Sequence, residues 1–90
     1  MSRTARRWTV EILVGEEDGH TYAEATLHDD IGNHVLGAGR ATLNPSDHDV
    51  PEIGDEIAVG RALTDLGRRL LRTAAGDIES VTHEHVRLSH

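Results

Sequence analysis

The sequence contains no cysteine and no phenylalanine, and its aromatic side chains are one tryptophan and one tyrosine. The absence of cysteine excludes disulfides, thiolate catalysis, cysteine-ligated zinc and iron–sulfur clusters. Apolar residues make up 37% of the 90 residues, so the core must consist mostly of small aliphatic side chains. We therefore expect a single domain over residues 1–90, ordered over about residues 7–82, with marginal stability as an isolated chain.

Lysine is also absent: the nine basic residues are all arginine, and sixteen acidic residues give a formal net charge of −7. A domain that binds nucleic acid is usually basic overall, so this balance argues against an easy assignment to that class. No apolar run approaches the ~18 residues of a membrane span. The arginines near the N-terminus precede no apolar segment of the kind found in secretory signals. We expect a cytoplasmic protein without membrane contacts.

Three stretches have the alternating pattern of half-buried strands, over residues 7–14, 20–28 and 34–43. Short glycine-containing turns separate them, which predicts an antiparallel meander. Gly37 and Gly39 fall on one face of the third strand and leave its backbone bare there. They indicate a bulge or the close approach of a helix or partner, and packing explains them better than a ligand platform does.

A helix is expected to begin at Pro51 and to end at Gly76, with Asp77 capping a further helical turn over residues 78–81. Apolar residues recur in it at spacings of four and three, which predicts an amphipathic stripe made of Val59, Leu63, Leu66, Leu70 and Ala74. This stripe must cover one face of the meander. The predicted fold is therefore α+β, a two-layer sandwich of three antiparallel strands followed by one long helix.

Arginines line the side of this helix opposite the stripe. At ~100° per residue, Arg61, Arg68 and Arg72 fall close to one line, with Arg69 at its shoulder and Asp65 interrupting it. Because the guanidinium group suits bidentate phosphate recognition, these four arginines are the candidate nucleic-acid-binding residues. The alternative is an ordinary solvated helix face.

No catalytic arrangement is recognisable: there is no nucleophile elbow, dinucleotide fingerprint, Walker loop or His-Glu-x-x-His motif. We expect no enzymatic activity, no cofactor and no small-molecule substrate. His83 and His85 would share a face of an extended segment, but standard zinc spacing is missing around them. We therefore expect no metal site and interpret the seven histidines as solvated surface residues: His20, His28, His34, His48, His83, His85 and His90.

A core of small aliphatic side chains and a sheet with open edges favour association, so we expect a homodimer. Trp8 is the candidate residue of the dimer interface, because aromatic side chains are enriched at interfaces.

Several short motifs carry a family resemblance: Trp8-Thr9-Val10, Val35-Leu36-Gly37-Ala38-Gly39, Leu43-Asn44-Pro45, Pro51-Glu52-Ile53-Gly54-Asp55-Glu56, Ala62-Leu63, Asp65-Leu66, Asp77-Ile78-Glu79 and Val81-Thr82-His83. With them the sequence resembles a small actinobacterial domain-of-unknown-function family with a dsRBD-like fold, which includes mycobacterial dormancy-associated proteins. The resemblance spans about residues 8–83. The sequence departs from the family at Gly60, where a better helix former is usual, and in the acidic stretch over residues 24–30.

The resemblance implies a β-β-β-α unit that pairs into a homodimer, similar in shape to ribosome hibernation factors. The predicted function is accordingly a non-enzymatic dimeric domain with a stress or dormancy role at the ribosome, in contact with ribosomal RNA. The alternative is an interaction module that binds a protein partner through its sheet edge or its acidic surface.

Overall fold

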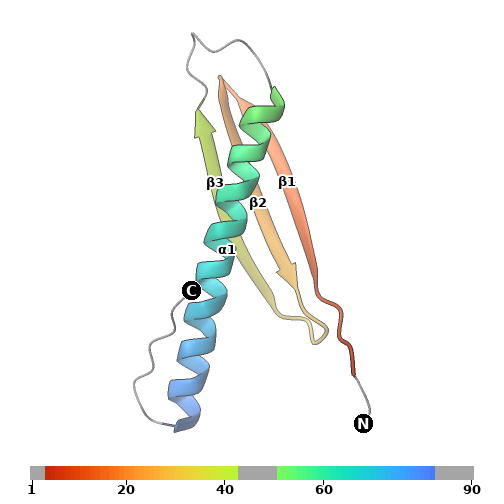
Figure 1. The fold of residues 1–90 in the computed structure, drawn as a ribbon, viewed down its shortest axis with the longest axis vertical. Helices are drawn as coiled ribbons and strands as arrows, with labels where there is room; N and C mark the ends of the chain where they lie inside the picture. Colours follow the sequence, from red (N-terminus) through yellow and green to blue (C-terminus); the bar gives the residue numbers. More distant parts are fainter. Residues whose placement is uncertain (1–3, 43–50, 83–90) are drawn as a thin grey trace.

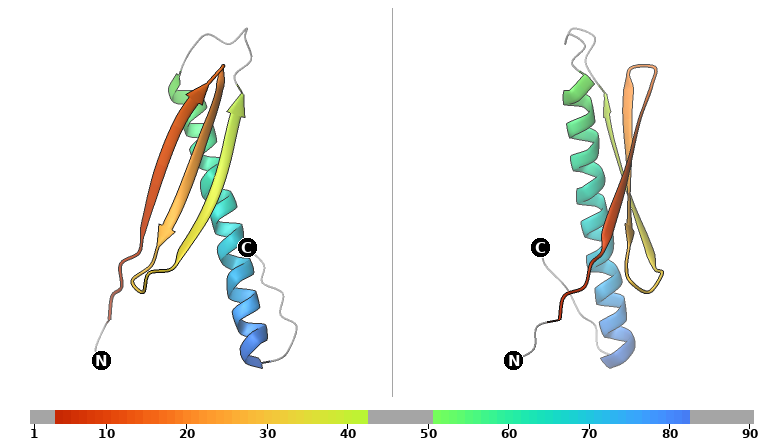
Figure 2. Two further views of the ribbon diagram at one scale, coloured as in Figure 1. Left: turned by 180° about the vertical axis from the view of Figure 1, so that it is seen from behind. Right: turned by 90° about the vertical axis from the view of Figure 1, so that its right-hand side faces the viewer.

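The computed structural model describes residues 4–42 and 51–82. Its elements are β1 (Thr9–Glu17), β2 (His20–His28), β3 (His34–Thr42) and α1 (Pro51–Thr82). The strands form an antiparallel sheet in the order β1-β2-β3, and α1 lies across one face of it (Figure 1). The two layers are separate in the side view (Figure 2). The α+β fold predicted from the sequence, a meander followed by one long helix, is confirmed.

The turn between β1 and β2 contains two residues, Asp18 and Gly19, with φ of 50° and 77°. Positive φ at both central positions is typical of a type I′ hairpin turn, for which Asp-Gly is a preferred sequence. Because the turn is this tight, β1 continues three residues beyond its predicted end at Val14. Gly15 is thereby a strand residue opposite Tyr22, and a Cβ atom at Gly15 would overlap the tyrosine ring.

The helix α1 begins at Pro51 as predicted, but it does not end at Gly76. A glycine that caps a helix adopts positive φ, whereas the described glycines with positive φ are Gly19 and Gly32. A glycine inside a helix costs only about 1 kcal/mol, which the flanking residues can offset. The helix therefore continues to Thr82, and its C-terminal part extends beyond the sheet (Figure 2). Within residues 4–42 and 51–82, no helix is long and apolar enough to cross a membrane.

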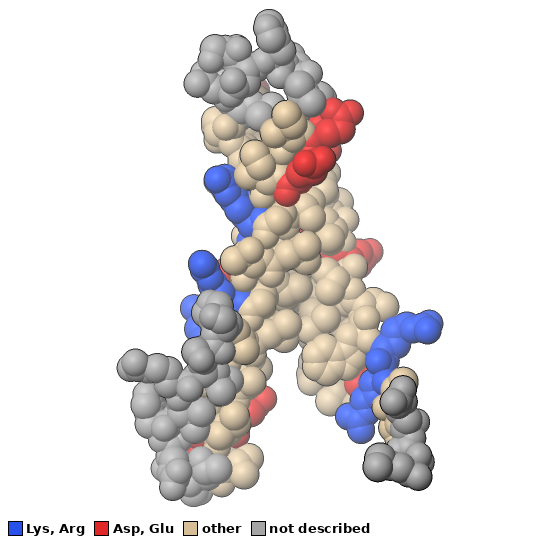
Figure 3. Space-filling model, in the orientation of Figure 1, with Lys and Arg blue, Asp and Glu red and all other residues tan. Residues whose placement is uncertain are grey.

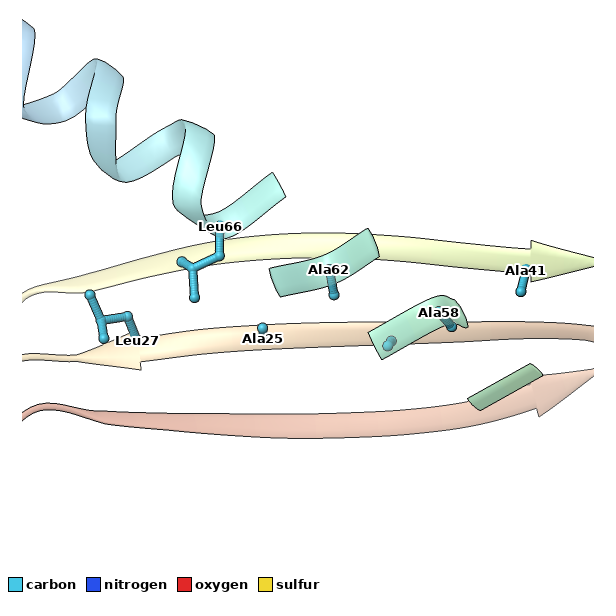
Figure 4. Close-up of a cluster of buried hydrophobic side chains, with 7 residues drawn as sticks. Ala25, Leu27, Ala41, Ala58, Ala62 and Leu66 are labelled. Carbon is cyan, nitrogen blue, oxygen red and sulfur yellow. The ribbon is translucent and has the colours of Figure 1, made fainter. Parts of the chain in front are cut away.

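The core lies where α1 crosses β2 and β3. Its buried side chains are small or aliphatic: Ala23, Ala25, Leu27, Ala41, Ala58, Ala62 and Leu66 (Figure 4). A Cβ atom at Gly37 would lie 2.7 Å from the Cα of Leu66, and one at Gly39 would lie 2.8 Å from the carbonyl carbon of Arg61. The two glycines thus let the helix backbone pack directly on β3, which confirms the close helix approach that the sequence predicted.

The helix face that packs on the sheet differs from the predicted stripe. Ala58 and Ala62 are buried together with Leu66, whereas Leu63 remains 42% exposed. The predicted stripe is thus confirmed at Leu66 but not at Leu63. The two glycines on β3 explain the difference, because they bring Ala58, Ala62 and Leu66 of α1 closest to the sheet. Val59 and Leu70 are only partly buried and pack against this core.

The apolar face of β1 is largely uncovered. Val10, Ile12 and Val14 pair with Leu27, Ala25 and Ala23 of β2 and therefore point to the same side of the sheet as the core. Yet they are 42%, 41% and 40% exposed. The cause is the path of α1, which packs mainly on β3 and β2 and makes little contact with β1.

Candidate anion-binding face

All charged residues of α1 between Ile57 and Gly76 lie on one side of the helix, along the outer edge of β3: Arg61, Asp65, Arg68, Arg69 and Arg72. Two contacts fix this orientation. The Nη1 atom of Arg61 donates a hydrogen bond to the carbonyl oxygen of Arg40 at 2.6 Å, and the Oδ2 atom of Asp65 accepts one from the backbone N–H of Ala38 at 2.9 Å. Basic side chains accordingly line this margin of the helix in Figure 3. We call this surface, made by the four helix arginines Arg61, Arg68, Arg69 and Arg72, the arginine face.

The contacts of Arg61 and Asp65 also explain why these residue types stand there. An edge strand presents unpaired backbone N–H and C=O groups. In β3 the N–H of Ala38 and the carbonyl of Arg40 point away from β2, and side chains from α1 satisfy both. Part of the predicted arginine line therefore protects a sheet edge, a role that helical periodicity alone does not reveal.

Asp65 is held in its ionised form by these neighbours. The backbone hydrogen bond from Ala38, followed by the side-chain hydrogen bond from Arg69, lowers the pKa of Asp65 below its ordinary value of 3.8. The Nε atom of Arg69 lies 3.0 Å from the Oδ2 atom of Asp65, one helical turn away. Asp65 thus offsets one of the positive charges on the arginine face.

The arginine face retains a clear excess of positive charge. It contains four arginines against one aspartate, so the local balance is +3 in a protein of net charge −7. Arg68 and Arg72 are exposed. Acidic side chains gather elsewhere, most densely where α1 begins (Figure 3). A single face of this acidic protein can therefore attract anions.

A shallow hollow of about 510 Å³ adjoins the arginine face at the beginning of β3. It is lined by His34, Val35, Leu36, Arg69, Arg72 and Thr73. The hydroxyl of Thr73 donates to the carbonyl oxygen of Arg69 at 2.9 Å, which leaves its oxygen free to accept. Two guanidinium groups and an imidazole beside an open surface suit an extended anion such as a phosphate backbone. His34 is a residue that the sequence did not assign to this site, because only the strand register brings it beside α1.

The histidines of the sheet make local contacts. The rings of His28 and His34 meet edge to face with centroids 4.6 Å apart, and the Nε2 atom of His28 lies 3.5 Å from a carboxylate oxygen of Glu11. The Nδ1 atom of His20 lies 3.0 Å from the hydroxyl oxygen of Thr42. Among residues 4–42 and 51–82, no three potential ligands are grouped as a metal site. His48, His83, His85 and His90 lie outside the described residues.

Trp8, the residue predicted at a dimer interface, precedes β1 and is 53% exposed. It lies far from the arginine face, since β1 and β3 are the two edges of the sheet. With Ala5, Arg6 and Arg7 it lines a second open hollow of about 440 Å³. The two predicted sites are therefore separate surfaces.

Comparisons with known proteins agree with the fold and with the prediction of a small family of unknown function. The chain is 49% identical over 83 residues to the uncharacterized protein Mb1767 of Mycobacterium bovis, with 92% of this chain and 87% of that protein covered. It is 42% identical over 77 residues to the uncharacterized protein Rv2632c of Mycobacterium tuberculosis, with 86% and 82% covered. The crystal structure of Rv2632c superposes with a TM-score of 0.83 at 37% identity and covers 93% of this chain and 99% of that one. The model of the Rv2632c-like family matches residues 6–87, and the chain therefore belongs to the Rv2632c-like family.

Proposed function

We propose that this protein is a non-enzymatic RNA-binding domain that contacts phosphates through its arginine face. The observation that carries the proposal is the segregation of charge on α1, where every charged residue between Ile57 and Gly76 lies along the edge of β3. Contacts between arginine and phosphate supply most of the sequence-independent affinity for nucleic acid. A local balance of +3 supports such contacts despite the overall negative charge.

The ribosome is the first target to test, in a stress or dormancy role. Ribosomal RNA presents a dense array of phosphates, and the family resemblance of the sequence led us to predict such a role. Arg68 and Arg72 are the residues to change, because both are exposed and neither has a hydrogen bond to β3 among those described. Arg61 and Arg69 are less suitable, since their loss would also disturb the edge of β3 or Asp65.

The test is co-sedimentation with ribosomes at low and at high salt. The wild type should co-sediment at low salt, and the double variant Arg68→Glu/Arg72→Glu should not. The matched variant Arg68→Lys/Arg72→Lys keeps the charge and should retain most of the binding. Circular dichroism of each variant verifies that the fold is intact. A wild type that fails to co-sediment at low salt eliminates the ribosomal target.

The second candidate function is the binding of another protein through the sheet edge or the acidic surface. The uncovered apolar face and open edge of β1 favour this candidate. The same double variant separates the two functions, because β1 lies at the opposite edge of the sheet from the arginine face. If partner binding uses β1, Arg68→Glu/Arg72→Glu should leave it nearly unchanged.

A further inference from the structure

The two edges of the sheet differ in how their backbone groups are hydrogen-bonded. On the outer edge of β3, side chains from α1 satisfy the N–H of Ala38 and the carbonyl of Arg40. On the outer edge of β1, the structure shows no comparable hydrogen bond from the described residues. An open edge of nine residues is a template for pairing with another strand.

The register determines which residues of β1 present this edge. Because the N–H of Ala38 points away from β2, its partner Glu24 directs its backbone groups toward β1, where it faces Leu13. The alternation along an antiparallel strand then turns the backbone groups of Val10, Ile12 and Val14 outward. These are the same three residues whose side chains are about two-fifths exposed on the helix side.

The two ends of β1 carry opposite charge. Arg6 and Arg7 precede the strand, and Glu16, Glu17 and Asp18 close it. In Figure 3 basic side chains lie at the N-terminal end of β1, and acidic ones gather at the opposite end of the molecule, where α1 begins. A strand with this polarity is complementary to an antiparallel copy of itself, because each basic end then meets an acidic end.

We infer that two copies of this chain pair through β1, antiparallel and centred on Ile12, to form one continuous six-stranded sheet. In this register Ile12 faces Ile12 of the second copy and Val10 faces its Val14. Arg7 then lies opposite Glu17 of the second copy, and Arg6 opposite its Asp18. The outward backbone groups of both strands pair, and the half-exposed side chains of β1 gain apolar neighbours.

Neighbouring registers fit less well. Centring the pair on Glu11 would place two Glu11 carboxylates directly opposite each other, which is destabilising. Centring it on Leu13 would place Val10 opposite Glu16 and would move Arg7 opposite Gly19. Only the register centred on Ile12 matches apolar with apolar residues in the middle of the strand and opposite charges at both ends.

The pairing would place the two arginine faces at the outer edges of the dimer. Adjacent strands are about 4.8 Å apart, so the two copies of β3 would be separated by roughly 24 Å across the six strands. Such a dimer would be bivalent for an extended polyanion. The pairing itself does not depend on RNA binding, since β1 and β3 are opposite edges of the sheet.

Disulfide trapping tests the register directly. The chain has no cysteine, so Ile12→Cys provides a single thiol. Hydrogen-bonded residues across antiparallel strands have Cα atoms about 5.5 Å apart, within the range that a disulfide spans. Ile12→Cys should form a covalent dimer under mild oxidation. The matched variant Thr9→Cys should not, because the two Thr9 residues would lie about 20 Å apart. Equal trapping of both variants, or of neither, would overturn the proposal.

A charge swap provides the second test. Within one copy, Arg7 and Glu17 are about 33 Å apart along the strand, too far to interact. Arg7→Glu and Glu17→Arg should each raise the dimer dissociation constant about tenfold, because each creates two like-charge pairs in the dimer. The double variant Arg7→Glu/Glu17→Arg should restore the dissociation constant of the wild type, because opposite charges again face each other.

Sedimentation equilibrium measures these dissociation constants, and circular dichroism verifies folding. The wild type should have twice its 9.8 kDa mass at micromolar concentration. A folded wild type that stays monomeric, or a double variant as weak as the single ones, would contradict pairing through β1.

Discussion

The side chain of Asp65 on α1 accepts the backbone N–H of Ala38 on β3 at 2.9 Å. The helix therefore completes the hydrogen bonding of an edge strand as well as covering the face of the sheet. The same carboxylate also accepts from Arg69 at 3.0 Å. This one residue thus links the core architecture to the arginine face, and it is the first position to test.

Replacing Asp65 by alanine should lower the stability and expose the edge of β3. The variant loses the acceptor for Ala38 and the partner of Arg69 together. Asp65→Asn keeps an oxygen that can accept from the Ala38 N–H. Its urea midpoint should therefore lie between those of Asp65→Ala and the wild type. If both substitutions leave the midpoint unchanged, the contact contributes nothing to the fold.

The contribution of Asp65 should depend on pH with a defined sign. Its pKa in the folded protein is lowered below 3.8 by the hydrogen bonds from Ala38 and Arg69. A lowered pKa means that the stabilisation is present above the unfolded value and is lost as pH falls through the folded one. The difference in urea midpoint between wild type and Asp65→Asn should therefore be largest at neutral pH and should shrink below pH 3.8. A difference that is constant with pH would argue against this role of the charge.

Replacing a glycine by alanine should lower the stability in β3 and raise it in α1. At Gly37 a Cβ atom would lie 2.7 Å from the Cα of Leu66, so Gly37→Ala must displace the helix and should cost about 1–3 kcal/mol. At Gly60 nothing lies within 4 Å of the added atom. Gly60→Ala should therefore stabilise the helix by about 0.5–1 kcal/mol. Thermal unfolding at one protein concentration measures both changes, and a stabilising Gly37→Ala would refute the direct packing of α1 on β3.

In the turn between β1 and β2, replacing Asp18 by asparagine should be tolerated, whereas replacing Gly19 by alanine should not. Gly19 has φ of 77°, where a residue with a Cβ atom is strained by about 1–2 kcal/mol. Gly19→Ala should destabilise by about that amount. Asp18→Asn should be close to neutral, because asparagine also adopts positive φ readily. The free energies of unfolding from urea titrations compare the two, and equal effects would contradict the type I′ geometry.

The element order and most element bounds followed from the sequence, because alternation, turn residues and helical periodicity are local signals. The strand β2 and the start of α1 at Pro51 match the sequence-based bounds. The end of β1 does not, although the Asp18-Gly19 pair was the available signal for a tight hairpin. The end of α1 does not either, since a glycine at the end of a helix and one inside it look alike in sequence.

The helix face that packs on the sheet was harder to predict than the helix itself. The leucines at spacings of four and three predicted one face, but Gly37 and Gly39 let the helix pack most closely through Ala58, Ala62 and Leu66. The arginine line was found from periodicity. Its contacts with Ala38 and Arg40 were not, because they depend on where α1 crosses β3. Sequence patterns thus identify surfaces, and packing determines which surface meets which.

If the arginine face binds RNA, the affinity should fall with salt, and the steepness of this fall should reflect the number of phosphate contacts. Each neutralised phosphate contributes about 0.7–0.9 to the slope of log K against log salt concentration. Replacing Arg68 and Arg72 by alanine should weaken binding and reduce the magnitude of the slope by roughly twice that amount. Fluorescence anisotropy with a labelled ribosomal RNA fragment over a salt series measures both quantities.

A control for the salt series is Arg6→Ala/Arg7→Ala, which removes the same charge from the opposite edge of the sheet. If the arginine face makes the contacts, this control should leave the slope per bound chain unchanged, even where pairing through β1 is weakened. Equal losses of slope in both double variants would instead indicate nonspecific attraction to any arginine. Because the total charge change is identical in the two double variants, the slopes per bound chain decide whether the arginine face or the net charge attracts RNA.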